Sequence, residues 1–431
     1  MPESRDVVVL EGARTPFCRA GTLLADLDAV ELGRAAVREA IERAEVDPDE
    51  IDEVIVGNIA GPHDAANVGR VIALSAGVPR RVPASTVNRN CGSALQAIAD
   101  GVLKIRAGEA DVVVAAGVES MSRIPVLYPE SFKRILARAA RAKSGRARLA
   151  AFAALRPHDF KPVIALETGL TDPVSGLNMG ETAEVLAREF GVTREEQDRF
   201  ALESHKRAAR AWSEGRLAEE VAPLPLPPRY ETLADKDNGV RENQSLEALA
   251  KLKPWFDREY GTVTAGNSSQ ITDGAAAVVL ASEERARAER LPILGRVRAV
   301  AFAACDPERM GLGPVYAAPL ALARAGITLE QVGLVEINEA FAAQVIACMR
   351  AMESPAFARE KLGLGAPVGS LDPARTNVNG GAIALGHPVG ASGARLVLTL
   401  LKEMARRDVA LGLAMLCIGG GQGGAIVVER A

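Results

Sequence analysis

Short apolar runs that alternate with helical segments constrain the fold of this chain more than any other feature. The run Ala110–Gly117 is apolar throughout, and a helical pattern at Ala94–Ala107 comes just before it. A strand without polar positions must be buried on both faces. The alternation therefore predicts an α/β fold with helices on both sides of a sheet. We expect further strands at Val7–Glu11, Ile51–Asn58, Ile293–Ala301, Val332–Ile337, Val409–Cys417 and Ala425–Glu429, and helices at Ala29–Ala44, Val68–Ala76, Pro319–Ala325, Phe341–Ala351 and Gly390–Ala405.

The alternation occurs twice along the chain. Gly274–Leu280 (GAAAVVL) closes its first occurrence, and the similar phrase Gly423–Glu429 (GGAIVVE) closes its second. Two similar α/β halves are therefore expected. The segment from about Ser122 to Tyr260 does not follow the alternation, so we interpret it as an insertion between the halves. Its proline-rich run Pro223–Pro228 is interpreted as an extended connector.

The insertion begins with a basic segment, Arg123–Lys161, which holds ten Lys and Arg residues against two acidic ones. Apolar residues recur there at helical spacing, which predicts basic amphipathic helices. They are Ile135, Leu136, Ala139, Ala140, Leu149, Phe152 and Ala153. Such helices form either a solvated charged face or a contact for phosphates, an anionic membrane surface or an acidic partner chain.

Charge and composition exclude several classes of protein. A net charge of −4 gives the whole chain no electrostatic attraction to nucleic acid. No run approaches the roughly 18 apolar residues of a membrane span, and no export signal is visible at the start. The five cysteines show neither a C-x-x-C pair nor zinc spacing, so we expect free thiols in a reducing cytoplasm and no metal site.

Two glycine-rich phrases contain candidate catalytic residues. Cys91 lies in TVNRNCGSAL, directly before an apolar helix, where the helix dipole favours a thiolate. A cysteine at such a place can equally be a core residue. His387 is one of only four histidines and lies in NVNGGAIALGHPVGASGA, where glycine and proline flank it before another helix. A lone histidine is more often structural, but the glycines allow close approach of a ligand.

Two further phrases add polar groups at strand ends. Cys417 ends an apolar strand in LCIGGGQGG, where the glycine N–H groups could face an oxyanion. Asn338 lies in EINEAF at the end of another strand. A nucleophilic thiol, a histidine, a second thiol and amide donors together favour acyl transfer with proton exchange next to a carbonyl. A thiol protease has no use for the second cysteine.

Several phrases resemble the signatures of the thiolase family, in the family's order and over nearly the whole chain. They are EGARTPF, NRNCGSALQAI, GVESMSR, NMGETAE, TVTAGNSSQITDGAAA, EINEAFA, NVNGGAIALGHPVGASGAR and LCIGGGQGGA. The resemblance implies two βαβαβαββ halves that form a five-layered α/β/α/β/α core with an inserted loop domain. The first half would span residues 1–121 and 261–284, and the second 285–431. The loop domain, 122–260, would bind coenzyme A and carry the basic insertion 123–161.

The resemblance also implies a role for each candidate residue. Cys91 matches the nucleophile that accepts the acyl group, and His387 matches the base that activates it. Cys417 matches the acid/base that exchanges a proton with the substrate α-carbon. Asn338 and His387 would form one oxyanion hole, and the N–H groups of Cys91 and Gly419 the other. The residues expected to contact coenzyme A or line its pocket are Met179, Ala265, Gly266, Ser269 and Phe341.

Two departures bear on the substrate. Asn178 stands where many short-chain biosynthetic thiolases carry histidine, and Gln422 stands where methionine is common. The basic insertion is similar to that of the thiolase β-subunit in fatty-acid oxidation complexes. We therefore favour a 3-ketoacyl-CoA thiolase, with ping-pong kinetics and with coenzyme A and acyl-CoA as substrates rather than cofactors. The alternatives are a biosynthetic acetyl-CoA acetyltransferase and a non-catalytic acyl-CoA-binding homologue. A decarboxylating ketoacyl synthase is disfavoured because Cys417 stands where such an enzyme needs a second catalytic group such as histidine.

The same resemblance sets the expected partners. A homodimer or tetramer is expected, and a hydratase/dehydrogenase α-subunit is a possible further partner. Peripheral membrane contact would run through the basic insertion 123–161. No nucleic-acid partner is expected.

Overall fold

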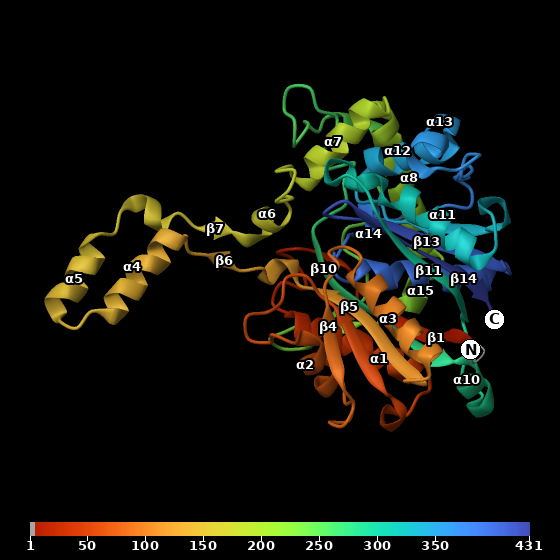
Figure 1. The fold of residues 1–431 in the computed structure, drawn as a ribbon, viewed down its shortest axis with the longest axis horizontal. Coiled ribbons are helices and arrows are strands. Elements are labelled where there is room, and N and C mark those ends of the chain that lie inside the picture. Colours follow the sequence, from red (N-terminus) through yellow and green to blue (C-terminus); the bar gives the residue numbers. More distant parts are fainter. Residues whose placement is uncertain (1–4) are drawn as a thin grey trace.

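One ten-stranded sheet runs through the protein in the computed structural model, which describes residues 5–431 (Figure 1). Its order is β12-β13-β14-β11-β1-β10-β5-β3-β4, with β2 paired to β10. The strands are β1 (Val7–Arg14), β2 (Cys18–Arg19), β3 (Glu53–Gly57), β4 (Ala84–Val87), β5 (Val112–Glu119), β10 (Thr272–Ser282), β11 (Gly295–Ala304), β12 (Leu334–Ile337), β13 (Leu411–Ile418) and β14 (Gln422–Arg430). A short pairing of β1 with β11, at Val8–Arg296 and Val9–Gly295, joins the two half-sheets.

Three helical layers enclose these half-sheets. The helices are α1 (Ala29–Arg43), α2 (Val68–Ser75), α3 (Ser93–Ala107), α11 (Gly313–Ala325), α12 (Ala342–Glu353) and α15 (Ser392–Arg407). α1 and α2 share a hydrophobic core with one face of the first half-sheet, and α11 and α12 do so with the second. α3 and α15 share a third core with strands of both half-sheets, so they form the central layer. The predicted five-layered α/β fold is confirmed.

Burial on both faces explains the apolar strands from which the fold was predicted. Every residue of β5 and of β10 is buried. β5 has helices on both sides: Val114 faces the outer core with α1, and Val113 faces the central core with α3 and α15. The strand therefore needs apolar side chains at successive positions rather than at every second one.

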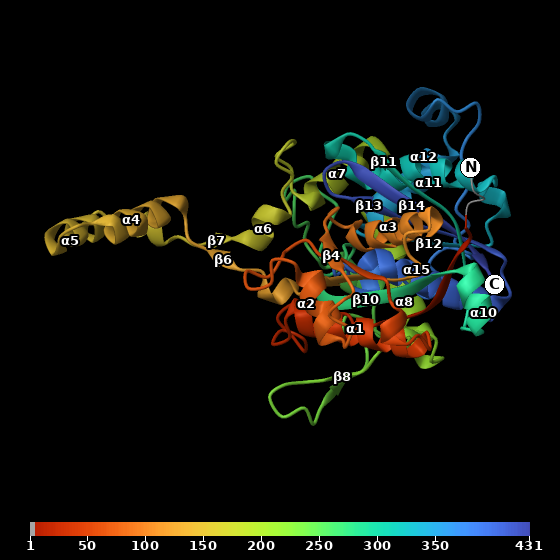
Figure 2. The ribbon, with the colours of Figure 1, turned by 60° about the horizontal axis from the view of Figure 1, so that its bottom comes forward.

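The sequence patterns missed some elements. β4 has four half-buried residues and no apolar run. Inside the insertion, α7 (Met179–Glu189) and α8 (Arg194–Ser213) begin with capping boxes at Asn178 and Thr193. The run Pro223–Pro228, expected to be an extended connector, is extended at β8 (Leu224–Pro225), which pairs with β9 (Leu233–Ala234) in a projecting ribbon (Figure 2). The remaining short helices are α6 (Ala165–Gly169), α9 (Leu246–Ala250), α10 (Glu283–Glu289), α13 (Pro355–Phe357) and α14 (Ala382–Leu385).

A helical hairpin projects from the body at the basic insertion (Figures 1 and 2). It consists of α4 (Glu130–Arg141) and α5 (Gly145–Ala153), on a stalk formed by β6 (Val126–Leu127) and β7 (Val163–Ile164). The prediction of an amphipathic helix is confirmed for α4, but it is wrong for α5, whose apolar residues are spread around the helix. Within residues 5–431, no helix is long and apolar enough to cross a membrane.

Candidate active site

The loop that carries Cys91 connects β4 to α3 and packs on the turn between β13 and β14. Gly92 is the N-cap of α3, and a Cβ there would lie 2.4 Å from Ile418 Cδ1, so only glycine allows this contact. Asn90 Nδ2 donates to the Gly419 carbonyl over 2.8 Å. Arg89 donates to the Gln422 side chain over 2.9 Å. The nucleophile loop of the first half is thus bonded to the glycine turn of the second.

The environment of Cys91 favours the thiol over the thiolate. Burial of the sulfur raises the pKa of Cys91, whereas a hydrogen bond from the Gly419 backbone N–H lowers it. The negative charge of Glu119 raises it further. Burial thus acts against the helix dipole and the amide donors, which favour the thiolate. Cys91 needs a base to become nucleophilic.

The second thiol, Cys417, is buried near the end of β13. Burial raises the pKa of Cys417 well above its ordinary value, and a thiolate at Cys91 would raise it further. Cys417 belongs to a small hydrophobic cluster that also includes Met179, Phe256 and Phe341. A buried neutral thiol at this place can give a proton to a carbanion.

His387 is buried in the loop before α15 and is held as a neutral base. Its Nδ1 lies within hydrogen-bond distance of Ser392 Oγ, and that hydroxyl donates to the Pro388 carbonyl over 3.1 Å. The hydroxyl must therefore accept from Nδ1–H, which leaves Nε2 as the unprotonated ring nitrogen. Burial lowers the pKa of His387 to about 3, and the charge of Arg395 contributes. Sequence reasoning missed Ser392, although it lies in the same GASGAR phrase.

Asn338 faces His387 from the end of β12. Its backbone N–H donates to the Met415 carbonyl over 2.9 Å, and its Nδ2 lies 3.4 Å from His387 Nε2. Its Oδ1 is buried and has no hydrogen-bond partner. The structure thus brings two predicted site residues together and leaves a polar atom free for a water molecule or a substrate group.

The residues expected to contact coenzyme A lie in two groups. Met179 and Phe341 are in the cluster of Cys417, and Ser269 donates its backbone N–H to the Ala340 carbonyl next to Phe341 over 2.9 Å. Ala265 is exposed. Gly266 packs against Leu249 and Leu252, which belong to a different hydrophobic cluster, and a Cβ there would lie 2.5 Å from the Leu252 side chain.

Two residues near Met179 refine the sequence interpretation. Phe256, which sequence reasoning missed, packs edge-on to Phe341 with ring centroids 6.1 Å apart. It also covers Gly180 so closely that a Cβ there would lie 2.2 Å from the ring. Asn178 caps α7 by accepting from the Gly180 N–H over 3.0 Å. The asparagine that replaces the short-chain histidine therefore has a structural role here.

Comparison with known proteins decides the family. Residues 7–284 match the model of the thiolase N-terminal domain, and residues 291–430 match that of the thiolase C-terminal domain. The chain belongs to the thiolase family. This thiolase is 42% identical over 424 residues to a 3-ketoacyl-CoA thiolase of Yersinia pestis (strain Pestoides F), a match that covers 98% of this chain and 96% of that one.

Solved structures show the same fold. The thiolase superposes on human mitochondrial 3-ketoacyl-CoA thiolase with a TM-score of 0.86 and 37% identity, covering 99% of both chains. It superposes equally well on the acetyl-CoA acetyltransferase of Bacillus anthracis, with a TM-score of 0.86, 36% identity and 99% of both chains covered. The predictions of the family, the fold and an acyltransferase are confirmed. The fold alone does not separate the two activities.

Proposed function

We propose that this thiolase is a 3-ketoacyl-CoA thiolase, which uses coenzyme A to cleave 3-ketoacyl-CoA into acetyl-CoA and a shortened acyl-CoA. The observation that carries the proposal is the pair of thiols on the packed loop and turn of the two halves: half-buried Cys91 follows Asn90, whose side chain donates to the Gly419 carbonyl, and buried Cys417 lies two residues before Gly419. A neutral histidine with a free Nε2 completes the set. The relative at 42% identity bears the name of this activity.

In the first half-reaction, His387 Nε2 takes the proton of Cys91 and the thiolate attacks the 3-keto carbon. The alkoxide faces the N–H groups of Cys91 and Gly419. The bond between C2 and C3 then breaks, and its electrons form the enolate of acetyl-CoA, whose oxygen faces Asn338 and His387. Cys417, which burial holds in its thiol form, gives its proton to C2. Acetyl-CoA leaves, and the shortened acyl group stays on Cys91 as a thioester.

The second half-reaction returns both thiols to their starting state. The Cys417 thiolate takes the proton of an incoming coenzyme A thiol. The resulting sulfur nucleophile attacks the acyl group, and Cys91 leaves as a thiolate that regains its proton from His387. The shortened acyl-CoA is released. The bonds, protons and electrons balance without an oxidant or a reductant, and the two steps form a ping-pong cycle.

The first test is thiolysis of 3-ketoacyl-CoA substrates of four to sixteen carbons, followed by loss of their absorbance. Activity that rises with chain length supports the proposal. Activity confined to acetoacetyl-CoA would assign the protein to the acetyl-CoA acetyltransferases, and no activity with any substrate would favour a binding protein. Cys91→Ala should reduce turnover roughly 10⁴-fold or more. Cys18→Ala is the control, because Cys18 is a buried thiol in β2, where it pairs with β10.

The division of labour between the thiols predicts a specific phenotype for Cys417→Ser. A serine hydroxyl is a much weaker acid than a thiol, so exchange of the acetyl-CoA α-proton with solvent deuterium should stop. Transfer of an acyl group from acyl-CoA onto Cys91 does not involve the α-carbon and should persist. Mass spectrometry of the intact protein and NMR of acetyl-CoA measure the two steps. Loss of both together would contradict the assignment.

Binding of coenzyme A, self-association and compartment are part of the same proposal. We assign Met179, Phe341 and Ser269 to the coenzyme A pocket, which their position in or beside the cluster of Cys417 supports, and Ala265 and Gly266 are the weaker candidates. β4 is an edge strand with half-buried residues, which supports a homodimer or tetramer. All five cysteines are free, which supports a reducing cytoplasm. Light scattering during gel filtration tests the oligomeric state.

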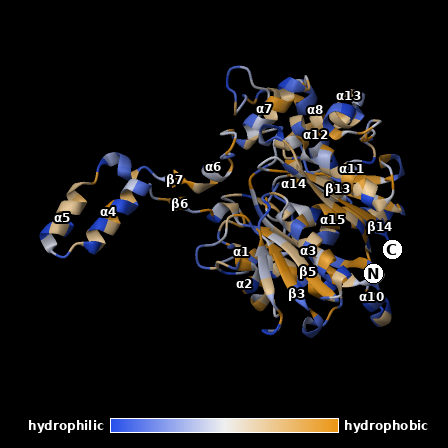
Figure 3. Ribbon diagram, viewed as in Figure 1, coloured by the Kyte–Doolittle hydropathy of each residue, from blue (hydrophilic) through white to orange (hydrophobic). Residues whose placement is uncertain are grey.

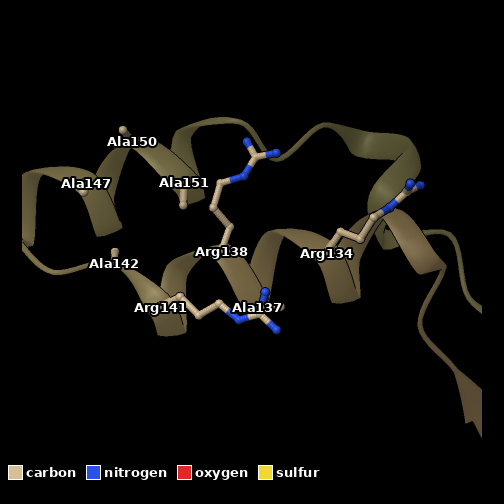
Figure 4. Close-up of a pocket in the computed structure, with 8 residues that line it drawn as sticks. All are labelled: Arg134, Ala137, Arg138, Arg141, Ala142, Ala147, Ala150 and Ala151. Carbon is tan, nitrogen blue, oxygen red and sulfur yellow. The ribbon is translucent and has the colours of Figure 1, made fainter.

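We also propose that the hairpin α4–α5 binds an anionic membrane surface, with an α-subunit as the alternative partner. Nine large apolar side chains of the hairpin and its stalk are exposed: Val126, Leu127, Tyr128, Leu136, Leu149, Phe152, Phe160, Val163 and Ile164. Figure 3 shows hydrophilic and hydrophobic residues interspersed along both helices. A cleft of about 750 Å³ lies between the helices, lined by alanines and by Arg134, Arg138 and Arg141 (Figure 4). Arginines and exposed apolar side chains together suit a lipid interface.

Co-sedimentation with phosphatidylglycerol vesicles tests this contact. Replacing Arg134, Arg138 and Arg141 by serine should weaken binding about 100-fold, since each cation near an anionic surface contributes roughly 1 kcal/mol. The control replaces Arg34, Arg38 and Lys253 by serine, which changes the net charge equally on exposed positions of the body. Equal binding by both variants would overturn the membrane proposal, and binding of an α-subunit without vesicle binding would support the alternative.

A further inference from the structure

The carboxyl group of Glu119 is buried where the two halves of the catalytic centre meet, and the reaction described above does not use it. Glu119 is the last residue of β5 and has no exposed surface. Its neighbours are the residues that follow β3 in the first half and the loop before α15 in the second. That second loop carries His387.

Four N–H donors surround this carboxyl group. Asn58 Nδ2 donates to Oε1 over 3.1 Å, Ala60 N donates to Oε1 over 3.0 Å, and Ile59 N donates to Oε2 over 3.2 Å. The Gly390 backbone N–H is the fourth donor. Among the ion pairs of residues 5–431, none involves Glu119. A carboxyl group held by amides from two separate segments is arranged to join those segments.

The contact with Gly390 leaves no free space. A Cβ on Gly390 would lie 2.5 Å from the Val118 carbonyl and 2.7 Å from Glu119 Oε2. On the opposite side, a Cβ on Gly117 would lie 2.1 Å from the Gly390 carbonyl. Glycine at both positions lets the His387 loop lie directly on the end of β5. Any shift of the carboxyl group would therefore move Gly390.

In the sequence, Gly390 lies between His387, the proposed base, and Ser392, the residue that orients its ring. It follows His387 by three residues and precedes Ser392 by two, and Ser392 Oγ contacts His387 Nδ1. We infer that Glu119 is a positioning residue: it fixes the loop 386–391 against the first half, so that His387 faces the nucleophile of that half. The inference rests on the proposed role of His387 as the base for Cys91.

The variant that tests the inference is Glu119→Gln, which keeps the shape of the side chain. It replaces one carboxyl oxygen by an NH₂ group, whose two N–H donors then face amides that also donate. The kcat for thiolysis should fall roughly 10- to 100-fold, because small displacements of a catalytic group have effects of this size. The KM for coenzyme A should change less than about twofold, because the loop is not part of the coenzyme A pocket. Glu119→Asp, which keeps the charge, should recover part of the loss.

A double-mutant cycle separates positioning from a general effect on the fold. The measured rate is carbamidomethylation of Cys91 by iodoacetamide, followed by mass spectrometry of the Cys91 peptide. Glu119→Gln should slow it about tenfold in the wild-type background and should not slow it in the His387→Ala background, since the two residues act through one group. Loss of the Glu119 charge, which raises the pKa of Cys91, can only speed the reaction in that background. Equal slowing in both backgrounds would overturn the inference.

Two controls keep the outcomes distinct. If His387→Ala alone leaves the rate for Cys91 unchanged, the proposed role of His387 fails, and the inference about Glu119 fails with it. Asp273→Asn is the matched variant, because Asp273 is another buried carboxyl group beside β5 whose partner is Ser122 rather than the catalytic loop. It should keep kcat within about twofold. If Glu119→Gln does not fold, the same cycle is run with Glu119→Asp, for which an unchanged kcat and rate would overturn the inference.

Discussion

The loops around Cys91, His387 and Cys417 and the hairpin α4–α5 contain similar residue types in opposite environments. In the catalytic region, glycines allow backbone segments to touch, and charged groups are buried with their partners. In the hairpin, Gly145 has no atom within 4 Å of its missing Cβ, and Leu149 is 72% exposed. The same residue type therefore contributes differently to stability in the two regions, because its contribution depends on the atoms that surround it.

The contrast also concerns what an apolar pattern means. In α15, the apolar positions meet both half-sheets and are buried. In α4 and α5, the helices pack mainly on each other, and only Ala139 and Ala151 are buried. Periodic apolar residues thus indicate a helix in both places, but a core in only one of them. Three predictions test whether this contrast extends to function and stability.

The largest difference in activity is expected between two glycine replacements. Gly390→Ala brings a methyl group within 2.5 Å of the Val118 carbonyl, which should destabilise the fold by about 1–3 kcal/mol. By displacing His387 it should also lower kcat about 100-fold. Gly145→Ala at the start of α5 should leave kcat unchanged and raise stability by up to about 1 kcal/mol. Urea unfolding and thiolysis rates measure both. Similar effects of the two replacements would contradict the contrast.

A buried ion pair of the body should likewise contribute more to stability than an exposed ion pair of the hairpin. Arg14 is fully buried and donates to Asp237 over 2.7 and 2.9 Å and to Glu220 over 2.7 Å. Asp237→Asn leaves a buried guanidinium short of charge and should lower the free energy of unfolding by about 3–5 kcal/mol. In the hairpin, Glu130 pairs with Lys133 on the surface, so Glu130→Gln should change stability by less than about 1 kcal/mol. A small effect of Asp237→Asn would weaken the comparison.

The smallest effect is a pH dependence that the buried histidine adds to stability. The pKa of His387 falls from 6.5 to about 3 on folding, so below about pH 6.5 the unfolded chain binds a proton that the folded protein rejects. Stability from this residue is present above pH 6.5 and is lost as pH falls toward 3. Between pH 7 and pH 5 the loss should be about 2 kcal/mol. His387→Asn should lack this component in urea titrations at the two pH values; an identical slope would show that His387 is not buried as a neutral group.

Much of the fold could be predicted because a strand that is buried on both faces has apolar residues at successive positions, and such a run is visible in the sequence. Ala110–Gly117 and Val409–Cys417 lie within or beside the observed strands β5 and β13. β4 has no such apolar run, since its residues are half-buried at a sheet edge. The helices α7 and α8 were missed even though their capping boxes can be read in the sequence at Asn178–Glu181 and Thr193–Glu196.

The candidate site divides in a similar way. Cys91, His387, Cys417 and Asn338 lie in glycine-rich or strand-end phrases, so sequence patterns alone single them out. Ser392, Phe256 and Glu119 were not assigned to the site, although Ser392 and Glu119 lie in the phrases NVNGGAIALGHPVGASGAR and GVESMSR, because the sequence does not show which of these side chains contact the site. Phe256 contacts Gly180, and Glu119 contacts Gly390; both contacts join residues more than 70 positions apart in the sequence. Ser392 contacts one ring nitrogen of His387.

The sequence by itself determined the layered α/β fold, the family and the four residue types that could perform acyl transfer. Local patterns record these properties because periodic burial and glycine-dependent turns are set by neighbouring residues. The tertiary structure decided the protonation states and the support of the site. Burial raises the pKa of Cys91 and of Cys417 and lowers that of His387 to about 3, and Glu119 joins the two halves. Desolvation and close packing depend on atoms brought together from distant parts of the chain, and no local pattern specifies them.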